Sequence, residues 1–199
     1  MIDKIYYINL DHRTDRREHI ENMLDEVGLM NISNRIPATF NENGVVGCVS
    51  SHINTLELFI ESGLDSCLII EDDLTITNKE KFVDNINSIF TNNVDFDVIQ
   101  ISGNHMMILD CEYNFLKRVH DSQTTSGYII SKEFAPILLS NFKESLSLIL
   151  QYGKRHEYCL DIYWKHLQPI SKWYCFRNSL GIQMESYSDI EKRVTSYGC

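Results

Sequence analysis

The sequence predicts an α/β fold in which helices cover both faces of a mostly parallel sheet, with a less regular C-terminal part. Short β-branched and aromatic runs alternate with helical patterns through the first half of the chain, as expected for strands and amphipathic helices. A strand–helix–strand–helix–strand order places consecutive strands in parallel, joined by right-handed crossovers. The length of 199 residues suits a single domain spanning 1–199, with halves at about 1–103 and 104–199.

The chain begins with a predicted strand at residues 4–10, because KIYYINL is rich in β-branched and aromatic side chains. A helix is expected next, with Asp15 as its candidate cap and Gly28 at its end. The apolar residues between these two recur at helical spacing, at Ile20, Met23, Leu24 and Val27.

A second helix is expected after Gly47, with Ser50 or Ser51 as its cap and Gly63 at its end. The apolar run at residues 66–71 then predicts a short buried strand that leads directly into acidic residues. These assignments extend the alternation of strand and helix that favours a parallel sheet.

Asn78 is the expected start of a third helix, and another buried strand is centred on residues 98–101. The second half is less regular. We expect a loop or hairpin at 104–123, a strand at 128–131, and helical segments near 133–141, 144–151 and 157–167. The remaining C-terminal residues show no periodicity and are expected to form a tail.

The composition excludes several classes of protein. Lys and Arg number 18 against 28 Asp and Glu, a net charge of −10 that repels phosphate backbones, so no nucleic-acid partner is expected. We find no apolar run of about 18 residues and no secretory signal. We therefore expect a cytoplasmic protein without an integral membrane segment, with room for peripheral contact at a membrane surface.

Six cysteines are widely and irregularly spaced, which favours buried free thiols over a zinc site or a disulfide framework. They are Cys48, Cys67, Cys111, Cys159, Cys175 and Cys199.

Three acids, Glu71, Asp72 and Asp73, follow the predicted strand at 66–71. Ligands of open α/β sheets bind at the carboxyl ends of the strands. Adjacent carboxylates there repel one another, and a divalent cation would relieve the repulsion. Oxygen ligands suit Mg²⁺ or Mn²⁺. The triplet indicates either a metal site or a solvated acidic turn.

The main cationic cluster, Arg13, Arg16 and Arg17, lies just beyond Asn9 at the end of the first strand. Such a cluster can bind a phosphate group. The alternative is a set of surface arginines at the start of a helix.

The segment GCVSSH, residues 47–52, leads into the second predicted helix. Backbone amides at a helix N-terminus attract anions, so Ser51 or His52 could contact a ligand. The alternative is that His52 is a structural histidine with internal hydrogen bonds.

Together these segments resemble glycosyltransferase family 25, which includes lipooligosaccharide and procollagen galactosyltransferases. The matching pieces run in order along nearly the whole chain. They are YYINLDHRTDRR at 6–17, GCVSSH at 47–52, LIIEDD at 68–73, TTSGYIIS at 124–131 and YSDIEKR at 187–193.

The resemblance implies a GT-A type fold, with a Rossmann-like sheet that binds a nucleotide sugar. It implies inverting transfer of a hexose, galactose or glucose, from a UDP-sugar with Mn²⁺ (or Mg²⁺) on the diphosphate. The acceptor would be a glycan, a lipid-linked oligosaccharide or a hydroxylated protein. The first half of the chain would bind the nucleotide sugar and the second half the acceptor.

The same resemblance assigns roles to individual residues. Asp73 is the expected metal ligand, with Glu71. The donor site would comprise Asn9, Arg13, Arg16, Ser51, His52, Glu71, Asp72, Thr125, Gly127 and Asp189. Gly127 permits close approach of a backbone and is equally interpreted as a strand bulge. Asp189 could instead cap a helix.

An inverting transfer needs a base that takes the acceptor proton. The main candidate is Asp161, which aromatic residues flank in EYCLDIYW. If residues 157–167 are helical, Glu157 lies one turn away on the same side and is a second candidate. The alternative is an exposed helix face, with Tyr163 and Trp164 packed in the core.

Two other functions remain open. One is a non-catalytic module that binds a nucleotide sugar or a glycan on the same scaffold, without turnover. The other is a nucleotidyltransferase, which would release pyrophosphate instead of UDP. The sequence contains no P-loop of the GxxxxGK[ST] type.

Overall fold

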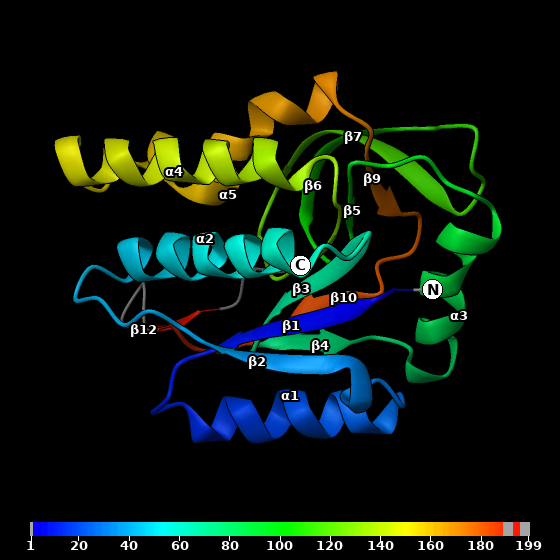
Figure 1. Ribbon diagram of the computed structural model, residues 1–199, viewed down its shortest axis with the longest axis horizontal. Helices are drawn as coiled ribbons and strands as arrows, with labels where there is room; N and C mark the ends of the chain where they lie inside the picture. Colours follow the sequence, from blue (N-terminus) through cyan, green and yellow to red (C-terminus); the bar gives the residue numbers. More distant parts are fainter. Residues whose placement is uncertain (1, 189–192, 196–199) are drawn as a thin grey trace.

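An eight-stranded sheet organises the computed structural model, which describes residues 2–188 and 193–195 (Figure 1). Its strand order is β2-β1-β3-β8-β5-β9-β7-β6. The strands are β1 (Lys4–Asn9), β2 (Ser33–Pro37), β3 (Ser66–Glu71), β5 (Val98–Gln100), β6 (Asn104–Leu109), β7 (Leu116–Gln123), β8 (Gly127–Ser131) and β9 (Trp173–Phe176). Four short strands form two small sheets: β4 (Leu74–Ile76) with β10 (Gly181–Gln183), and β11 (Ser186–Ser188) with β12 (Arg193–Thr195).

The predicted α/β class and mostly parallel sheet are confirmed. β1 pairs in parallel with both β2 and β3, and β5 pairs in parallel with β9. The remaining pairs are antiparallel. As a result, only β7 and β8 run against the other strands of this sheet, and the carboxyl ends of β1, β3 and β5 share one edge.

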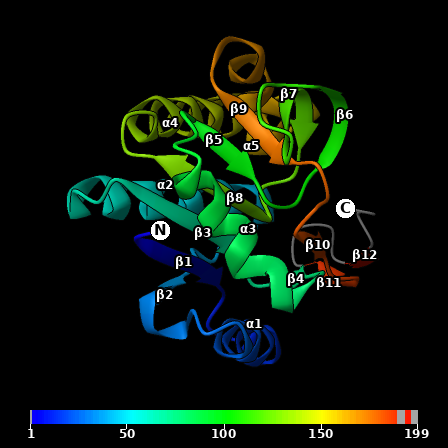
Figure 2. The same ribbon diagram turned by 90° about the vertical axis from the view of Figure 1, so that its right-hand side faces the viewer.

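Helices cover both faces of the sheet, as predicted (Figures 1 and 2). They are α1 (Thr14–Glu26), α2 (Gly44–Ser62), α3 (Lys79–Thr91), α4 (Ala135–Tyr152) and α5 (Leu160–Tyr163), with 3₁₀ turns at Met30–Ile32, His156–Tyr158 and Trp164–Ile170. One apolar cluster lies between the sheet and α2 and α4, and the other between the sheet and α1 and α3. Tyr6 and Ile8 face the first cluster, and Ile5 and Tyr7 face the second, as strand alternation requires. No helix in the described residues is long and apolar enough to cross a bilayer.

The helix starts differ from the sequence predictions at two places. α1 has Arg13 as its N-cap, and Asp15 lies inside the first turn. α2 begins at Gly44, so Ser50 and Ser51 lie inside the helix and do not cap it. The predicted helix ends at Gly28 and Gly63 are confirmed, since both glycines have positive φ just past a helix. Asn78 caps α3 as predicted.

The C-terminal half is more regular than predicted. The segment 104–123 forms the hairpin β6–β7, and the two helical patterns near 133–141 and 144–151 belong to the single helix α4. The expectation of a tail is wrong for β9, which is fully buried between β5 and β7. Its sequence WYCF is too short to show periodicity, and tertiary pairing determines its conformation.

Candidate active site at the carboxyl edge of the sheet

The acidic triplet lies where β1 and β3 end side by side. Its second residue, Asp72, is held by contacts from β1 and α1. Asn9 donates from Nδ2 to Asp72 Oδ2 at 2.6 Å, and Arg16 Nη1 lies 3.0 Å from Asp72 Oδ1. Arg35 on β2 fixes the amide, because its Nε donates to Asn9 Oδ1. The predicted association of Asn9 and Arg16 with the acidic triplet is therefore present in the fold.

Arg16 also bridges to the third acid of the triplet. The same Nη1 lies 3.0 Å from Asp73 Oδ2, which accepts a further hydrogen bond from Gln183 Nε2 at 3.2 Å. Both acids and the arginine are buried. Burial, aided by the charges of Glu71 and Asp72 and opposed by Arg16, raises the pKa of Asp73 to about 7. One guanidinium therefore does not compensate the negative charge of the triplet.

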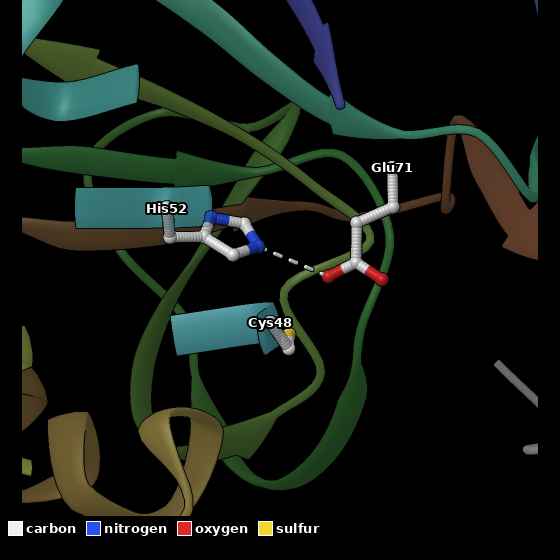
Figure 3. Close-up of side chains that lie close together, drawn as sticks. All are labelled: Cys48, His52 and Glu71. Carbon is white, nitrogen blue, oxygen red and sulfur yellow. Dashed lines mark hydrogen bonds and ion pairs between the residues drawn. The ribbon is translucent and has the colours of Figure 1, made fainter. Parts of the chain in front are cut away.

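Glu71 faces a different set of partners. Its Oε1 lies 3.2 Å from His52 Nε2 and accepts a hydrogen bond from Thr125 Oγ1 at 2.6 Å. His52 Nδ1 is 3.0 Å from the hydroxyl of Tyr128. Burial opposes ionisation of Glu71, but the hydrogen bond from His52 and the other contacts outweigh it and lower the pKa. The triplet is thus divided. Asp72 and Asp73 face Arg16, whereas Glu71 faces His52 on α2 (Figure 3).

A pocket of about 250 Å³ opens beside Glu71. Glu71, Thr125 and Asp161 contribute to its wall, and so does Gln183, the partner of Asp73. The full lining is Val45, Cys48, Glu71, Gln123, Thr124, Thr125, Lys154, His156, Cys159, Leu160, Asp161, Ile162 and Gln183. The pocket thus joins the acidic edge of the sheet to the segment that holds the candidate base.

Asp161 lies in the first turn of α5, and its Oδ2 accepts a hydrogen bond from the Thr124 backbone amide at 3.2 Å. Burial raises the pKa of Asp161, with the charge of Glu71 acting in the same direction. A carboxylate with a raised pKa that lines a pocket is suited to accept a proton.

The predicted helix face shared by Glu157 and Asp161 is wrong. Glu157 belongs to a separate 3₁₀ turn, and Cys159 breaks the helix between them with ψ of 138°. Glu157 is exposed and is not among the residues that line the pocket. The core interpretation of Trp164 is confirmed, since this side chain is fully buried.

Other predicted site residues have structural contacts. Arg13 forms a bidentate pair with Asp15 and holds the pKa of that acid at about 2. Ser51 donates to the Gly47 carbonyl and accepts from the Thr39 amide. Ser51 and His52 lie in the second turn of α2 or later, so they are not at the helix N-terminus, where the backbone amides attract anions.

Two more predictions concern Gly127 and Asp189. The β3–β8 register runs without a shift through Gly127, so the bulge interpretation is wrong. A Cβ at Gly127 would lie 2.6 Å from Ile101 Cγ1, which explains the glycine by close packing in the sheet. Asp189 lies outside the described residues.

Sequence reasoning missed three contributors: Arg35, Cys48 and Gln183. Gln183 and Arg35 carry no motif, and only the pairing of β10 with β4 and of β2 with β1 brings them to the site. Cys48 precedes His52 by one helical turn. That spacing was the available signal.

A hard divalent cation fits the site at Asp73. Its Oδ1 is buried and has no hydrogen-bond partner among the described residues. Mg²⁺ and similar cations commonly take one or two protein carboxylates and complete their shell with water and phosphate oxygens. Glu71, the other predicted metal ligand, directs its carboxylate toward His52 instead.

Comparison with known proteins identifies the family. Residues 38–152, over half of the chain, match the family described as glycosyltransferase family 25 (LPS biosynthesis protein). The chain belongs to glycosyltransferase family 25. The matched region contains α2, the acidic triplet and β8, whereas Asn9, Arg16 and Asp161 lie outside it.

A second comparison extends the similarity beyond the region that the family matches. The chain is 28% identical to procollagen galactosyltransferase 1 of Danio rerio in an alignment over 171 residues, and the match covers 69% of this chain. The matched region spans 28% of that relative's length.

Solved structures support the GT-A-like fold. A glycosyltransferase involved in the glycosylation of the major capsid of PBCV-1 aligns with a TM-score of 0.55 and 13% identity, covering 96% of this chain and 97% of its own. UDP-glucose pyrophosphorylase complexed with UDP-glucose aligns with a TM-score of 0.60 and 9% identity, with the same coverage. At these identities the likeness concerns the fold, and it agrees with the GT-A type architecture expected of family 25.

Proposed function

We propose that this family 25 protein is a glycosyltransferase that moves a hexose, galactose or glucose, from a UDP-sugar to a hydroxyl group, with inversion at the anomeric carbon. The donor diphosphate would lie at the edge formed by β1 and β3, and the sugar would extend into the pocket. The acceptor would be a glycan, a lipid-linked oligosaccharide or a hydroxylated protein, and a lipid-linked acceptor would bring the protein to a membrane surface.

One observation carries this proposal. The buried carboxylates of Asp72 and Asp73, whose negative charge is only partly balanced, lie beside a pocket that contains the carboxylate of Asp161. Arg16 bridges Asp72 and Asp73, and Asp161 lines the adjacent pocket. The reaction needs a positive field where a diphosphate leaves and a proton acceptor on the other side of the sugar. The aspartate pair would supply the first requirement by holding a divalent cation, and Asp161 would supply the second.

The proposed reaction replaces one bond at C1 of the sugar with another. The acceptor oxygen attacks C1 of the sugar, the bond between C1 and the diphosphate oxygen breaks, and UDP leaves with the bonding electrons. Asp161 takes the acceptor proton, which its raised pKa favours. Asp73 would hold Mn²⁺ or Mg²⁺ through Oδ1, which has no hydrogen-bond partner among the described residues. When bound, the cation would neutralise charge on the diphosphate. Arg16 keeps the two aspartates in place.

The proposal is tested by UDP release from a panel of UDP-sugars, with and without Mn²⁺. We expect metal-dependent release from a UDP-hexose, and a loss of about 100-fold or more in Asp73→Ala because diphosphate stabilisation is removed. Asp65→Ala is a matched control, since its side chain is 94% exposed and far from the edge that holds the triplet.

Four results would contradict the proposal. UDP-sugar binding without release would favour a binding module, and pyrophosphate release would favour nucleotidyl transfer. Release that needs no metal and survives in Asp73→Ala would show that Asp73 is not the metal ligand. A product in which the anomeric configuration is retained, detected by NMR, would contradict inversion.

A further inference from the structure

A second group of potential metal ligands lies at the floor of the pocket. Cys48 and His52 are four residues apart on α2, so both side chains project from one face of the helix. Glu71 reaches the same point from the end of β3 (Figure 3). One ligand atom from each residue lies within 4.8 Å of the other two. Among the described residues, no other trio of His, Cys, Asp or Glu side chains converges in this way.

The imidazole of this trio is held in place before any ligand arrives. His52 is almost completely buried, its ring stacks on Tyr128, and it packs edge-on against Phe142. Its Nδ1 lies 3.0 Å from the Tyr128 hydroxyl, which leaves Nε2 directed at Glu71. Metal-bound histidines usually have such a partner on the second ring nitrogen, because it fixes the ring and the tautomer.

The carboxylate is also oriented. Thr125 donates a hydrogen bond to Glu71 Oε1 at 2.6 Å. Cys48 and Glu71 both line the pocket, whereas His52 lies behind them and is not part of the lining. Three protein ligands with one side open to a pocket is the arrangement of zinc sites that keep a position for water or a substrate oxygen.

We propose that Cys48, His52 and Glu71 form a binding site for a borderline-soft divalent cation such as Zn²⁺, with its fourth position open to the pocket. Sulfur and imidazole ligands favour Zn²⁺ over Mg²⁺ or Mn²⁺, which prefer oxygen. This site is therefore chemically distinct from the one at Asp73, where the protein offers a carboxylate and neither sulfur nor imidazole. The wide spacing of the cysteines disfavours zinc sites that use several of them, but it does not exclude this site, which uses a single cysteine.

Binding requires modest rearrangement and the release of one proton. Bonds of about 2.0–2.3 Å in a tetrahedral site place ligand atoms roughly 3.3–3.8 Å apart. The three ligand atoms lie within 4.8 Å of one another, so a separation near that limit would close by about 1 Å. The thiol of Cys48 loses its proton to solvent as the metal–sulfur bond forms. The ring proton of His52 then lies on Nδ1 and is donated to the Tyr128 hydroxyl oxygen.

The test uses Co²⁺ and Zn²⁺ with the full chain, after removal of bound metals with a chelator. We expect one Co²⁺ per chain, with the intense visible bands of tetrahedral cobalt and a near-ultraviolet band from thiolate-to-cobalt charge transfer. Zn²⁺ should displace the cobalt. A weak octahedral spectrum without the sulfur band would overturn the proposal.

Variants locate the site. Cys48→Ser should abolish the sulfur band and weaken Zn²⁺ binding by about 100-fold or more, and Tyr128→Phe should weaken it by about 10-fold. Cys159→Ser is the matched control, because Cys159 also lines the pocket. The assignment is wrong if the band persists in Cys48→Ser and disappears in Cys159→Ser.

Two further variants keep the test independent of folding and of the proposed reaction. If circular dichroism shows that Cys48→Ser is unfolded, Glu71→Gln, which preserves side-chain shape, should still weaken Zn²⁺ binding by at least about 10-fold. Unchanged binding in that variant would overturn the proposal. Asp73→Ala should retain the cobalt spectrum even where UDP release is lost, so the failure of either proposal can be recognised separately.

Discussion

Arg16 determines the charge balance at the residue scale. Its Nη1 contacts both Asp72 and Asp73 at 3.0 Å, and all three side chains are about nine-tenths buried. A buried carboxylate that lacks a full counter-charge favours its protonated form, which is why the pKa of Asp73 rises to about 7. A cation bound at Asp73 would favour the ionised form, so metal binding and proton release at this residue are linked.

The candidate base predicts a pH dependence. Burial raises the pKa of Asp161 above its ordinary value, and a base must be ionised to accept a proton. The rate constant kcat should therefore rise with pH through this raised pKa, above the ordinary range near 3.9. Asp161→Asn should lower kcat by about 10²- to 10⁴-fold and abolish this limb of the pH profile. The measurement is UDP release across a range of pH at saturating donor and acceptor.

Glu157→Gln provides the control for that prediction. Glu157 is exposed, 3.9 Å from Arg155, and separated from the pocket lining. We expect its rate and pH profile to match those of the unaltered protein. If the pH–rate profile changes in Glu157→Gln and not in Asp161→Asn, then Glu157 is the base and Asp161 is not.

At the scale of single elements, α2 depends on a glycine in its second turn. A Cβ on Gly47 would lie 2.6 Å from the backbone oxygen of Thr39, and backbone cannot move aside cheaply. Gly47→Ala should therefore destabilise the protein, although alanine inside a helix is ordinarily about 0.5–1 kcal/mol better than glycine. We expect a lower midpoint of urea unfolding.

The exposed residue Glu61, near the end of the same helix, is the control. Glu61→Ala should leave the midpoint nearly unchanged, because both residues are good helix formers. If the urea midpoint rises in Gly47→Ala, then the backbone at Thr39 can move away from α2 without lowering the free energy of unfolding.

Elements with strong local signals could be predicted from the sequence, and those fixed by tertiary contacts could not. The β-branched run of β3 and the glycine that ends α2 identified both elements. The predicted start of α2 is too late: its N-cap is Asn43, a favoured residue type at that position, although its side chain makes no capping hydrogen bond. The site followed the same division: Asp72 and Asp73 were visible as a motif, whereas Gln183 reaches them only through the pairing of β10 with β4.

At the scale of the whole molecule, β9 connects the two apolar clusters. Trp173 and Cys175 face the cluster under α2 and α4, and Tyr174 and Phe176 face the cluster on the other side of the sheet. Trp173 also packs edge-on against Trp164, with ring centroids 4.9 Å apart. One short strand thus contributes to both halves of the core, and we expect the two halves to unfold together.

Trp173→Ala tests this connection. Deleting a fully buried indole should lower the free energy of unfolding by about 3–5 kcal/mol. Near- and far-ultraviolet circular dichroism should still report one coincident transition in urea. Ile170→Ala, at a side chain that is 79% exposed, should change stability by less than about 0.5 kcal/mol. Separate transitions in the unaltered protein would refute the coupling of the two clusters.

The position of β9 also constrains how the chain can fold while the ribosome is making it. β9 pairs with β5 on one side and β7 on the other, yet it follows both of them in the chain. Until Phe176 has left the exit tunnel, β5 presents an unsatisfied edge, and the β6–β7 hairpin has no strand of the sheet to join. The nascent chain therefore exposes open strand edges until β9 has been made. The sheet can close only after β9 emerges, and before that point β5 and β7 are open to pairing with other chains.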